Sequence, residues 1–168
     1  MGNIDILKQE LNNMQIQFDR IEPIREKDGA MVARVYHSDN SFVLKHFQRD
    51  DFKREILNYK ILRDLKIPTL QVISFNESSI LLEDVLCSKI YRMGNEDDLD
   101  DPAVAKQIAK WYRLLHEKGY EYVSKNGKHL YSESDFFTLE VIEKIKYDTK
   151  TQEYPVWNYI EENFSQLL

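Results

Sequence analysis

Hydrophobic and polar residues follow two periods along the chain, and each period predicts one kind of secondary structure. Residues 4–16 place apolar side chains on one helical face, at Ile4, Leu7, Leu11 and Met14. Residues 18–24 alternate between apolar and polar positions, as strands do, and residues 31–36 and 41–47 are two further strand-like runs. The polar residues 37–40 separate the last two runs, so these runs are predicted to pair as a hairpin.

The pattern continues with a helix and two more strands. Asp50 or Asp51 is expected to cap a helix that runs to about Leu65. Residues 69–75 and 80–85 read as two further strands joined by a polar turn. The order of helix, three strands, helix and two strands predicts an α+β protein, in which one helix packs on a five-stranded antiparallel sheet.

A helical region is expected after the sheet. It opens with the acidic residues 96–101, and a helix then begins at Pro102 and is expected to stop at Gly119. Two further helices are predicted over residues 134–147 and 155–168.

The expected domain organisation is a sheet domain over residues 1–86 and a partial helical domain over residues 87–168. The last predicted helix ends without a glycine, a basic last turn or a polar tail, although helices commonly end on such a signal. The sequence therefore suggests that the chain is part of a longer protein.

The composition excludes several classes of function. The 168 residues carry 23 Lys and Arg against 29 Asp and Glu, a net charge of -6, whereas nucleic-acid binding needs an excess of basic residues to neutralise phosphates. Cys87 is the single cysteine, so no internal disulfide is expected. The chain shows neither a secretion signal nor an apolar run long enough to span a membrane. We expect a cytoplasmic protein that binds neither nucleic acid nor membrane.

One carboxylate occupies a position where the pattern predicts an apolar residue. On a helical wheel, Glu55 falls in the sector of Phe52, Ile56, Tyr59 and Leu62. An ionised carboxylate that points inward is costly without a cation nearby, and Lys45 shares a strand face with Val43 and Phe47. Two interpretations stay open: an ion pair between Lys45 and Glu55, or a lysine that extends to solvent and a partly solvated glutamate.

The order of these features is similar to that of a protein-kinase-like small lobe, in which a strand lysine precedes a helix with an inward glutamate. The matching segments are residues 42–45 (FVLK), 54–62 (REILNYKIL), 67–69 (IPT), 80–85 (ILLEDV) and 111–116 (WYRLLH). In order and spacing they resemble the N-terminal half of the aminoglycoside phosphotransferase and choline kinase-like family. The resemblance covers about residues 15–120.

The resemblance implies an ATP site. Lys45 would contact the α- and β-phosphates, and Glu55 would orient this lysine. The loop around Gly29 would cover the phosphates, although Asp28-Gly29-Ala30-Met31 contains one glycine and so departs from a glycine-rich kinase loop.

The resemblance also implies where the base binds. Val43 would pack on the adenine, and Leu82 would lie at the back of the site. The backbone of Glu83 and Val85 would hydrogen-bond the base at the hinge between the two lobes.

The residues that catalyse phosphoryl transfer are not found. Such a site needs an Asp that orients the acceptor hydroxyl, an Asn five residues later and a second metal-binding Asp. No Asp in the sequence has Asn at that spacing, and Asp-Phe-Gly does not occur. His37-Ser38-Asp39 imitates a catalytic loop, but Leu44 stands where the Asn belongs. No catalytic or metal-binding residue is assigned, and Mg²⁺ is expected only in a complete family member.

Two functions remain open. The first is the nucleotide-binding half of an ATP-dependent phosphotransferase that acts on a hydroxyl of an aminoglycoside, choline-like or sugar-like acceptor. The second is a non-catalytic, kinase-like binding or interaction module that forms a homodimer through exposed apolar surface.

Overall fold

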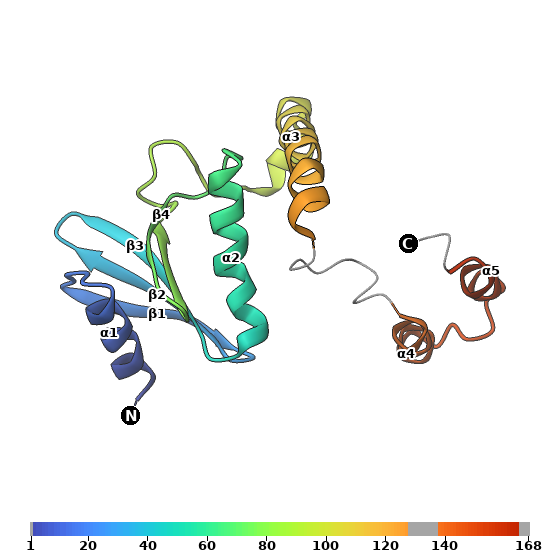
Figure 1. Ribbon diagram of the computed structural model, residues 1–168, viewed down its shortest axis with the longest axis horizontal. Helices are drawn as coiled ribbons and strands as arrows, with labels where there is room; N and C mark the ends of the chain where they lie inside the picture. The colour runs from blue at the N-terminus through green and yellow to red at the C-terminus, as the bar shows by residue number, and fades with distance from the viewer. Residues whose placement is uncertain (1, 128–137, 165–168) are drawn as a thin grey trace. The chain divides into compact units, whose positions relative to one another are not determined.

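The computed structural model describes residues 2–127 and 138–164. These residues form an α+β protein with a five-stranded antiparallel sheet followed by helices (Figure 1). The first elements are α1 (Asn3–Asn13), β1 (Arg20–Lys27), β2 (Ala30–His37), β3 (Asn40–Phe47), α2 (Asp50–Asp64), β4 (Val72–Phe75) and β5 (Ser79–Glu83). The later elements are the 3₁₀ helix η1 (Glu96–Leu99), α3 (Pro102–Asn126), α4 (Leu139–Thr149) and α5 (Val156–Glu162). The predicted fold class and number of strands are confirmed.

Tight turns determine how the strands pair. The strands lie in the order β1-β2-β3-β5-β4, and each neighbouring pair is antiparallel. Asp28 and Ser38, in the turns on either side of β2, have positive φ angles of 54° and 52°, as tight hairpins require. Between β4 and β5, Asn76 Oδ1 accepts a hydrogen bond from the Ser79 N–H at 2.8 Å. The predicted hairpins therefore form at turns of the expected residue types.

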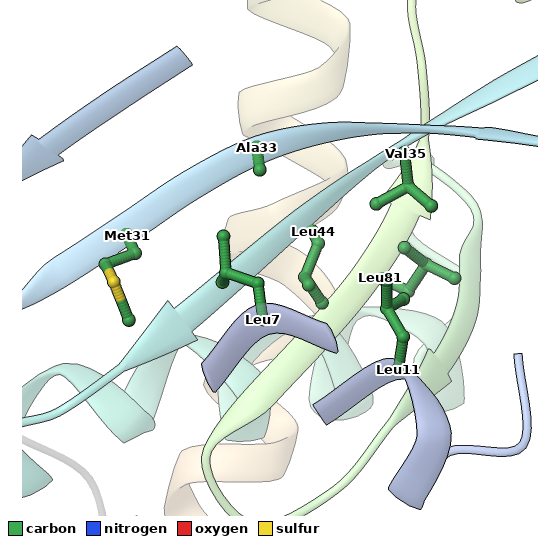
Figure 2. Packing of buried hydrophobic residues seen from close by; sticks show 7 residues of the cluster. All are labelled: Leu7, Leu11, Met31, Ala33, Val35, Leu44 and Leu81. Carbon is green, nitrogen blue, oxygen red and sulfur yellow. The ribbon is translucent and has the colours of Figure 1, made fainter. Parts of the chain in front are cut away.

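Helix α1 covers one face of the sheet. Its apolar side packs into a cluster made of Leu7, Leu11, Met31, Ala33, Val35, Leu44 and Leu81 (Figure 2). Burying one leucine contributes roughly 1.5–3 kcal/mol, so Leu7 and Leu11 are the main attachment of α1. Glu10 adds polar contacts at the edge, because its carboxylate accepts hydrogen bonds from Ser79 Oγ at 2.6 Å and Asn76 Nδ2 at 2.8 Å.

Helix α2 covers part of the opposite face, so the sheet has a helix on each side (Figure 1). Its buried Ile56 packs with Phe47, Ile80 and Leu82, which belong to the end of β3 and to β5. The expectation of one packed helix was wrong. The physical reason is that β2 and β3 carry apolar residues on both faces, and the second apolar face also needs cover.

The start of α2 differs from the prediction. Arg49, and not an aspartate, occupies the N-cap position, and Asp50 and Asp51 lie in the first turn. Acidic side chains are favourable there because the helix N-terminus carries partial positive charge. Asp51 Oδ2 also accepts a hydrogen bond from Arg49 Nη2 at 2.7 Å.

Helix α3 begins as predicted and ends later. Asp101 Oδ1 accepts a hydrogen bond from the Ala103 N–H at 2.7 Å, which satisfies a free donor at the helix start. The helix continues through Gly119 to Asn126, so the expectation that Gly119 ends it was wrong. One glycine inside a helix costs only about 0.5–1 kcal/mol relative to alanine, which does not suffice to break it.

The last two described helices correspond in part to the predicted ones. Helix α4 begins after Thr138, whose Oγ1 accepts a hydrogen bond from the Val141 N–H at 3.3 Å. The predicted helical residues 134–137 and 165–168 lie outside the described residues. Lys146 of α4 is buried and forms ion pairs with Glu143 and Glu161.

The chain divides into two compact units, Met1–Gly119 and Tyr120–Leu168. Within the first unit, the beginning of α3 is attached to the loop after α2, because Trp111 Nε1 donates to the Pro68 carbonyl at 2.7 Å. The functional domain boundary near residue 86 stays a prediction. Among the described residues, none of the helices combines the length and the apolar composition needed to cross a membrane.

Candidate functional site

Strands β3 and β5 place Val43, Lys45 and Leu82 on the sheet face that α2 partly covers. Val43 pairs with Leu82 and Lys45 with Ile80, and residues directly opposite on paired strands point to the same face. Ile80 and Leu82 are buried in the cluster beneath α2. Four half-buried residues in the middle of β2 and β3 on this face form what we call the open half-face: Val32, Arg34, Val43 and Lys45.

The ion pair that the sequence suggests is present. Lys45 Nζ lies 2.6 Å from Glu55 Oε1, and the two side chains are 29% and 35% exposed. The pair therefore forms while remaining partly in contact with solvent, and an ion pair this exposed contributes about 0.2–1 kcal/mol. An ammonium held in place at the edge of an apolar surface suits a ligand that joins anionic groups to a flat apolar group.

Two neighbours of this pair were missed in the sequence. Val32 lies directly opposite Lys45 in the β2–β3 register. Tyr59 follows Glu55 by one helical turn and packs against the cluster beneath α2. Burial raises the pKa of the Tyr59 phenol, partly against the effect of the Lys45 charge. Strand register would have identified Val32, whereas the helical wheel placed Tyr59 in the sector of Glu55 without assigning it to the site.

The chain leaves β5 through a turn that we call the connector, residues 83–88. The Glu83 N–H donates to the Gln71 carbonyl at 2.9 Å, so it is already engaged. The Val85 carbonyl accepts from the Ser88 N–H at 3.2 Å. In the part of the chain that the structure describes, the Val85 N–H has no hydrogen-bond acceptor. Of the two backbone N–H groups, that of Val85 is the one available to a ligand.

Asp84, which lies between the two predicted base-binding residues, was also missed. Its side chain is 3% exposed. Its Oδ2 accepts hydrogen bonds from Arg34 Nε at 2.5 Å and Ser41 Oγ at 2.7 Å, and its Oδ1 accepts one from the Leu86 N–H at 3.1 Å. Burial by itself raises the pKa of Asp84, but these three hydrogen bonds outweigh burial and lower it. Asp84 is therefore a buried and fully paired carboxylate.

Gly29 lies in the turn between β1 and β2, with φ of +84°. The pairs Arg34–Val43, Val32–Lys45 and Ala30–Phe47 follow one another along β2 and β3. The Gly29 turn therefore lies beyond Lys45, and the Arg34–Asp84 pair lies at the opposite, Val43 end of the open half-face.

The residues of the open half-face are half-buried, and two hollows of the structure lie elsewhere. A hollow of about 540 Å³ lies where α1 leads into β1 and includes His37 among its lining residues. A second, of about 440 Å³, lies between the end of α2 and β4. Neither is lined by Lys45, Glu55 or Val43. His37 ends β2, and Ser38 and Asp39 form the turn between β2 and β3, away from the Gly29 end.

No protein-family model and no curated protein matches the sequence. The residues of the open half-face and the connector are therefore the basis for a functional proposal.

Proposed function

We propose that this chain is the nucleotide-binding half of an ATP-dependent small-molecule phosphotransferase, with a protein-kinase-like small lobe. The observation that carries the proposal is the 2.6 Å contact between Lys45 Nζ and Glu55 Oε1. In protein kinases, a lysine on the third strand pairs with a glutamate on the following helix, and the lysine holds nucleotide phosphates. Lys45 lies on β3 and Glu55 on α2, the next element of the chain, which supports the same role here.

The order of groups along the open half-face supports the orientation of the nucleotide. The base packs on Val43 and Val32, close to the connector, and hydrogen-bonds the Val85 N–H. Lys45 lies two residues from Val43 on β3, which is about 7 Å along a strand, and it binds the α- and β-phosphates. The Gly29 turn lies further along the same direction and covers the phosphates.

The transfer step requires groups that these residues do not supply. The sequence has no Asp with Asn five residues later and no Asp-Phe-Gly, which are the catalytic and metal-binding groups of kinases. The chain's own residues bind and orient ATP. Mg²⁺ and the acceptor, a hydroxyl of an aminoglycoside, a choline-like or a sugar-like compound, belong to the complete enzyme.

Titration calorimetry with ATP, with and without Mg²⁺, tests the proposal. The wild-type chain should bind ATP, and Lys45→Ala should weaken binding about tenfold or more, because a hydrogen bond to a charged group contributes about 1.5–3 kcal/mol. Lys53→Ala is the matched control, since Lys53 also forms a 2.7 Å ion pair, with Asp50, and is 36% exposed. Absence of binding by the wild-type chain at millimolar ATP contradicts the proposal.

A second candidate function is a non-catalytic module that associates with another copy of itself. It is supported by Ile108 and Tyr112, which lie one turn apart on α3 and are 51% and 53% exposed. Within this helix, all of which is described, none of the residues is buried. Exposed apolar positions on one face of a helix are typical of interaction surfaces.

Sedimentation velocity distinguishes this second candidate. Self-association through α3 predicts a dimer that Ile108→Lys dissociates, because a charge is placed in an apolar contact. Gln107→Lys, at the exposed position just before it on the same helix, should leave the dimer intact. A monomer at every protein concentration rules out self-association as the function.

A further inference from the structure

We infer that Arg34 and Asp84 are positioning residues whose ion pair holds the connector in the conformation that presents the Val85 N–H to the base of a nucleotide. The inference rests on the proposed nucleotide-binding function. It deepens that function by assigning base recognition and phosphate recognition to separate groups of residues.

The pair bridges elements that are far apart in sequence. Arg34 lies on β2 and Asp84 follows β5, and β3 lies between these strands in the sheet. The Arg34 side chain therefore extends across β3, where Ser41 Oγ donates to the same carboxylate oxygen, Asp84 Oδ2. One buried oxygen thus links the connector to two neighbouring strands.

Asp84 also forms hydrogen bonds with the part of the connector that follows Val85. Its Oδ1 accepts the Leu86 N–H at 3.1 Å, and its own carbonyl accepts the Cys87 N–H at 2.9 Å. Val85 lies between these two bonds. Asp84 therefore holds the turn around Val85 through its carboxylate and its backbone carbonyl.

The hydrogen bonds among Arg34, Ser41 and Asp84 are better suited to orienting the connector than to stabilising the fold. A buried ion pair rarely stabilises a fold more than well-packed apolar residues of similar volume. Its hydrogen bonds are directional, however, and a charge-assisted bond holds its partners in a narrow geometry. Arg34 is also the residue directly opposite Val43, the predicted base-packing residue. The ion pair therefore lies at the base-binding end of the open half-face, whereas Lys45 and Gly29 lie at the phosphate end.

Two probes separate the two ends of the site: ATP, which carries a base, and inorganic tripolyphosphate, which does not. Affinities are measured by calorimetry at constant salt on the complete chain. Arg34→Met should weaken ATP binding about tenfold, the loss expected when one charge-assisted contact no longer positions its partner, and should leave tripolyphosphate affinity unchanged. Arg34→Lys should restore part of the ATP affinity. Lys45→Ala should weaken the binding of both probes.

The control variant is Arg63→Met. Arg63 lies at the end of α2 and forms an ion pair with the neighbouring Asp64. This variant should change neither affinity. Unchanged ATP binding by folded Arg34→Met overturns the inference and leaves the proposed function intact. An equal loss of both probes in Arg34→Met also overturns it, because that outcome indicates general structural damage.

The remaining outcomes also decide the matter. If the wild-type chain binds neither probe, the proposed function fails and the inference fails with it. If Arg34→Met does not fold, as judged by circular dichroism, Ser41→Ala replaces it, because this variant removes one of the two side-chain donors to Asp84. Selective loss of ATP affinity in folded Ser41→Ala supports the inference. If Ser41→Ala also fails to fold, or folds without selective loss, the cluster maintains the fold only and the inference is wrong.

Discussion

In the proposed site, the role of Glu55 is to hold the Lys45 ammonium and not to stabilise the fold. The two side chains are about a third exposed, and such a pair contributes about 0.2–1 kcal/mol. Substitutions here should therefore separate ligand affinity from stability, which substitutions in the core cannot do.

Glu55→Gln tests that separation. The variant keeps the size of the side chain but removes the charge that orients Lys45, so ATP affinity should fall several-fold while the free energy of unfolding changes by less than about 1 kcal/mol. Calorimetry and urea unfolding measure the two quantities. Glu117→Gln is the control, since Glu117 also forms a helical ion pair, 2.8 Å from Arg113. Equal ATP affinity in the Glu55 and Glu117 variants would show that Glu55 does not orient Lys45.

Asp84 predicts a dependence of stability on pH. Its pKa is lower in the folded protein than in the unfolded chain, because the hydrogen bonds from Arg34, Ser41 and Leu86 outweigh burial. The stabilisation is thus fully present above about pH 4, the ordinary range of an aspartate, and is lost as the pH falls through the lower folded value.

Urea unfolding between pH 6 and pH 2.5 measures this effect. One such group changes the free energy of unfolding by at most about 1.4 kcal/mol per pH unit. Asp84→Asn should be less stable than the wild type at pH 6 and should lose less stability on acidification. Parallel curves for the two proteins would mean that Asp84 does not titrate with the fold.

At the scale of elements, the turn between β1 and β2 depends on glycine. Gly29 has φ of +84°, and an added Cβ would lie 3.0 Å from Arg49 Cγ. Arg49 is exposed and able to move, so the main cost of Gly29→Ala is the left-handed backbone, about 1–2 kcal/mol.

Gly119→Ala should have the opposite effect on stability. Gly119 lies inside α3, and an added Cβ meets nothing within 4 Å, so alanine should stabilise the chain by about 0.5–1 kcal/mol. In thermal unfolding, Gly29→Ala should lower the melting temperature and Gly119→Ala should raise it. A stabilising Gly29→Ala would mean that the turn does not hold this conformation.

Periodicity predicted most elements of the sheet domain. The spacing of Leu7 and Leu11 predicted α1, and strand-like runs predicted β2 and β3. An apolar sector with one acid suggested the Lys45–Glu55 pair as one of two interpretations. These features are local or depend on neighbouring elements, so a single sequence contains their signal.

The features that the sequence did not predict depend on distant contacts. The packing of α1 on the second face of the sheet, and the pairing of Asp84 with Arg34, join residues dozens of positions apart. Helix α3 continues through Gly119 because helical residues on both sides of it outweigh the low helix propensity of one glycine.

For the whole molecule, we predict binding of ATP without turnover. ATP has a lysine, an apolar wall and a backbone donor to contact, but the sequence lacks the Asp and Asn spacing that activates an acceptor. Phosphate release by the 168-residue chain should equal the background rate, with or without Mg²⁺ and with kanamycin, choline or glucose present. Turnover above background that Lys45→Ala abolishes would contradict this and would require catalytic residues not identified in the chain.

The location of bound ATP tests the proposed binding site. Backbone amide NMR of ¹⁵N-labelled protein, titrated with ATP, reports on the open half-face and the connector separately from the rest of the chain. ATP bound at the open half-face should cause the largest shift changes at Gly29, Lys45 and Val85. No changes at saturating ATP, or changes confined to the hollow where α1 leads into β1, around Gln15 and Gln17, would contradict it.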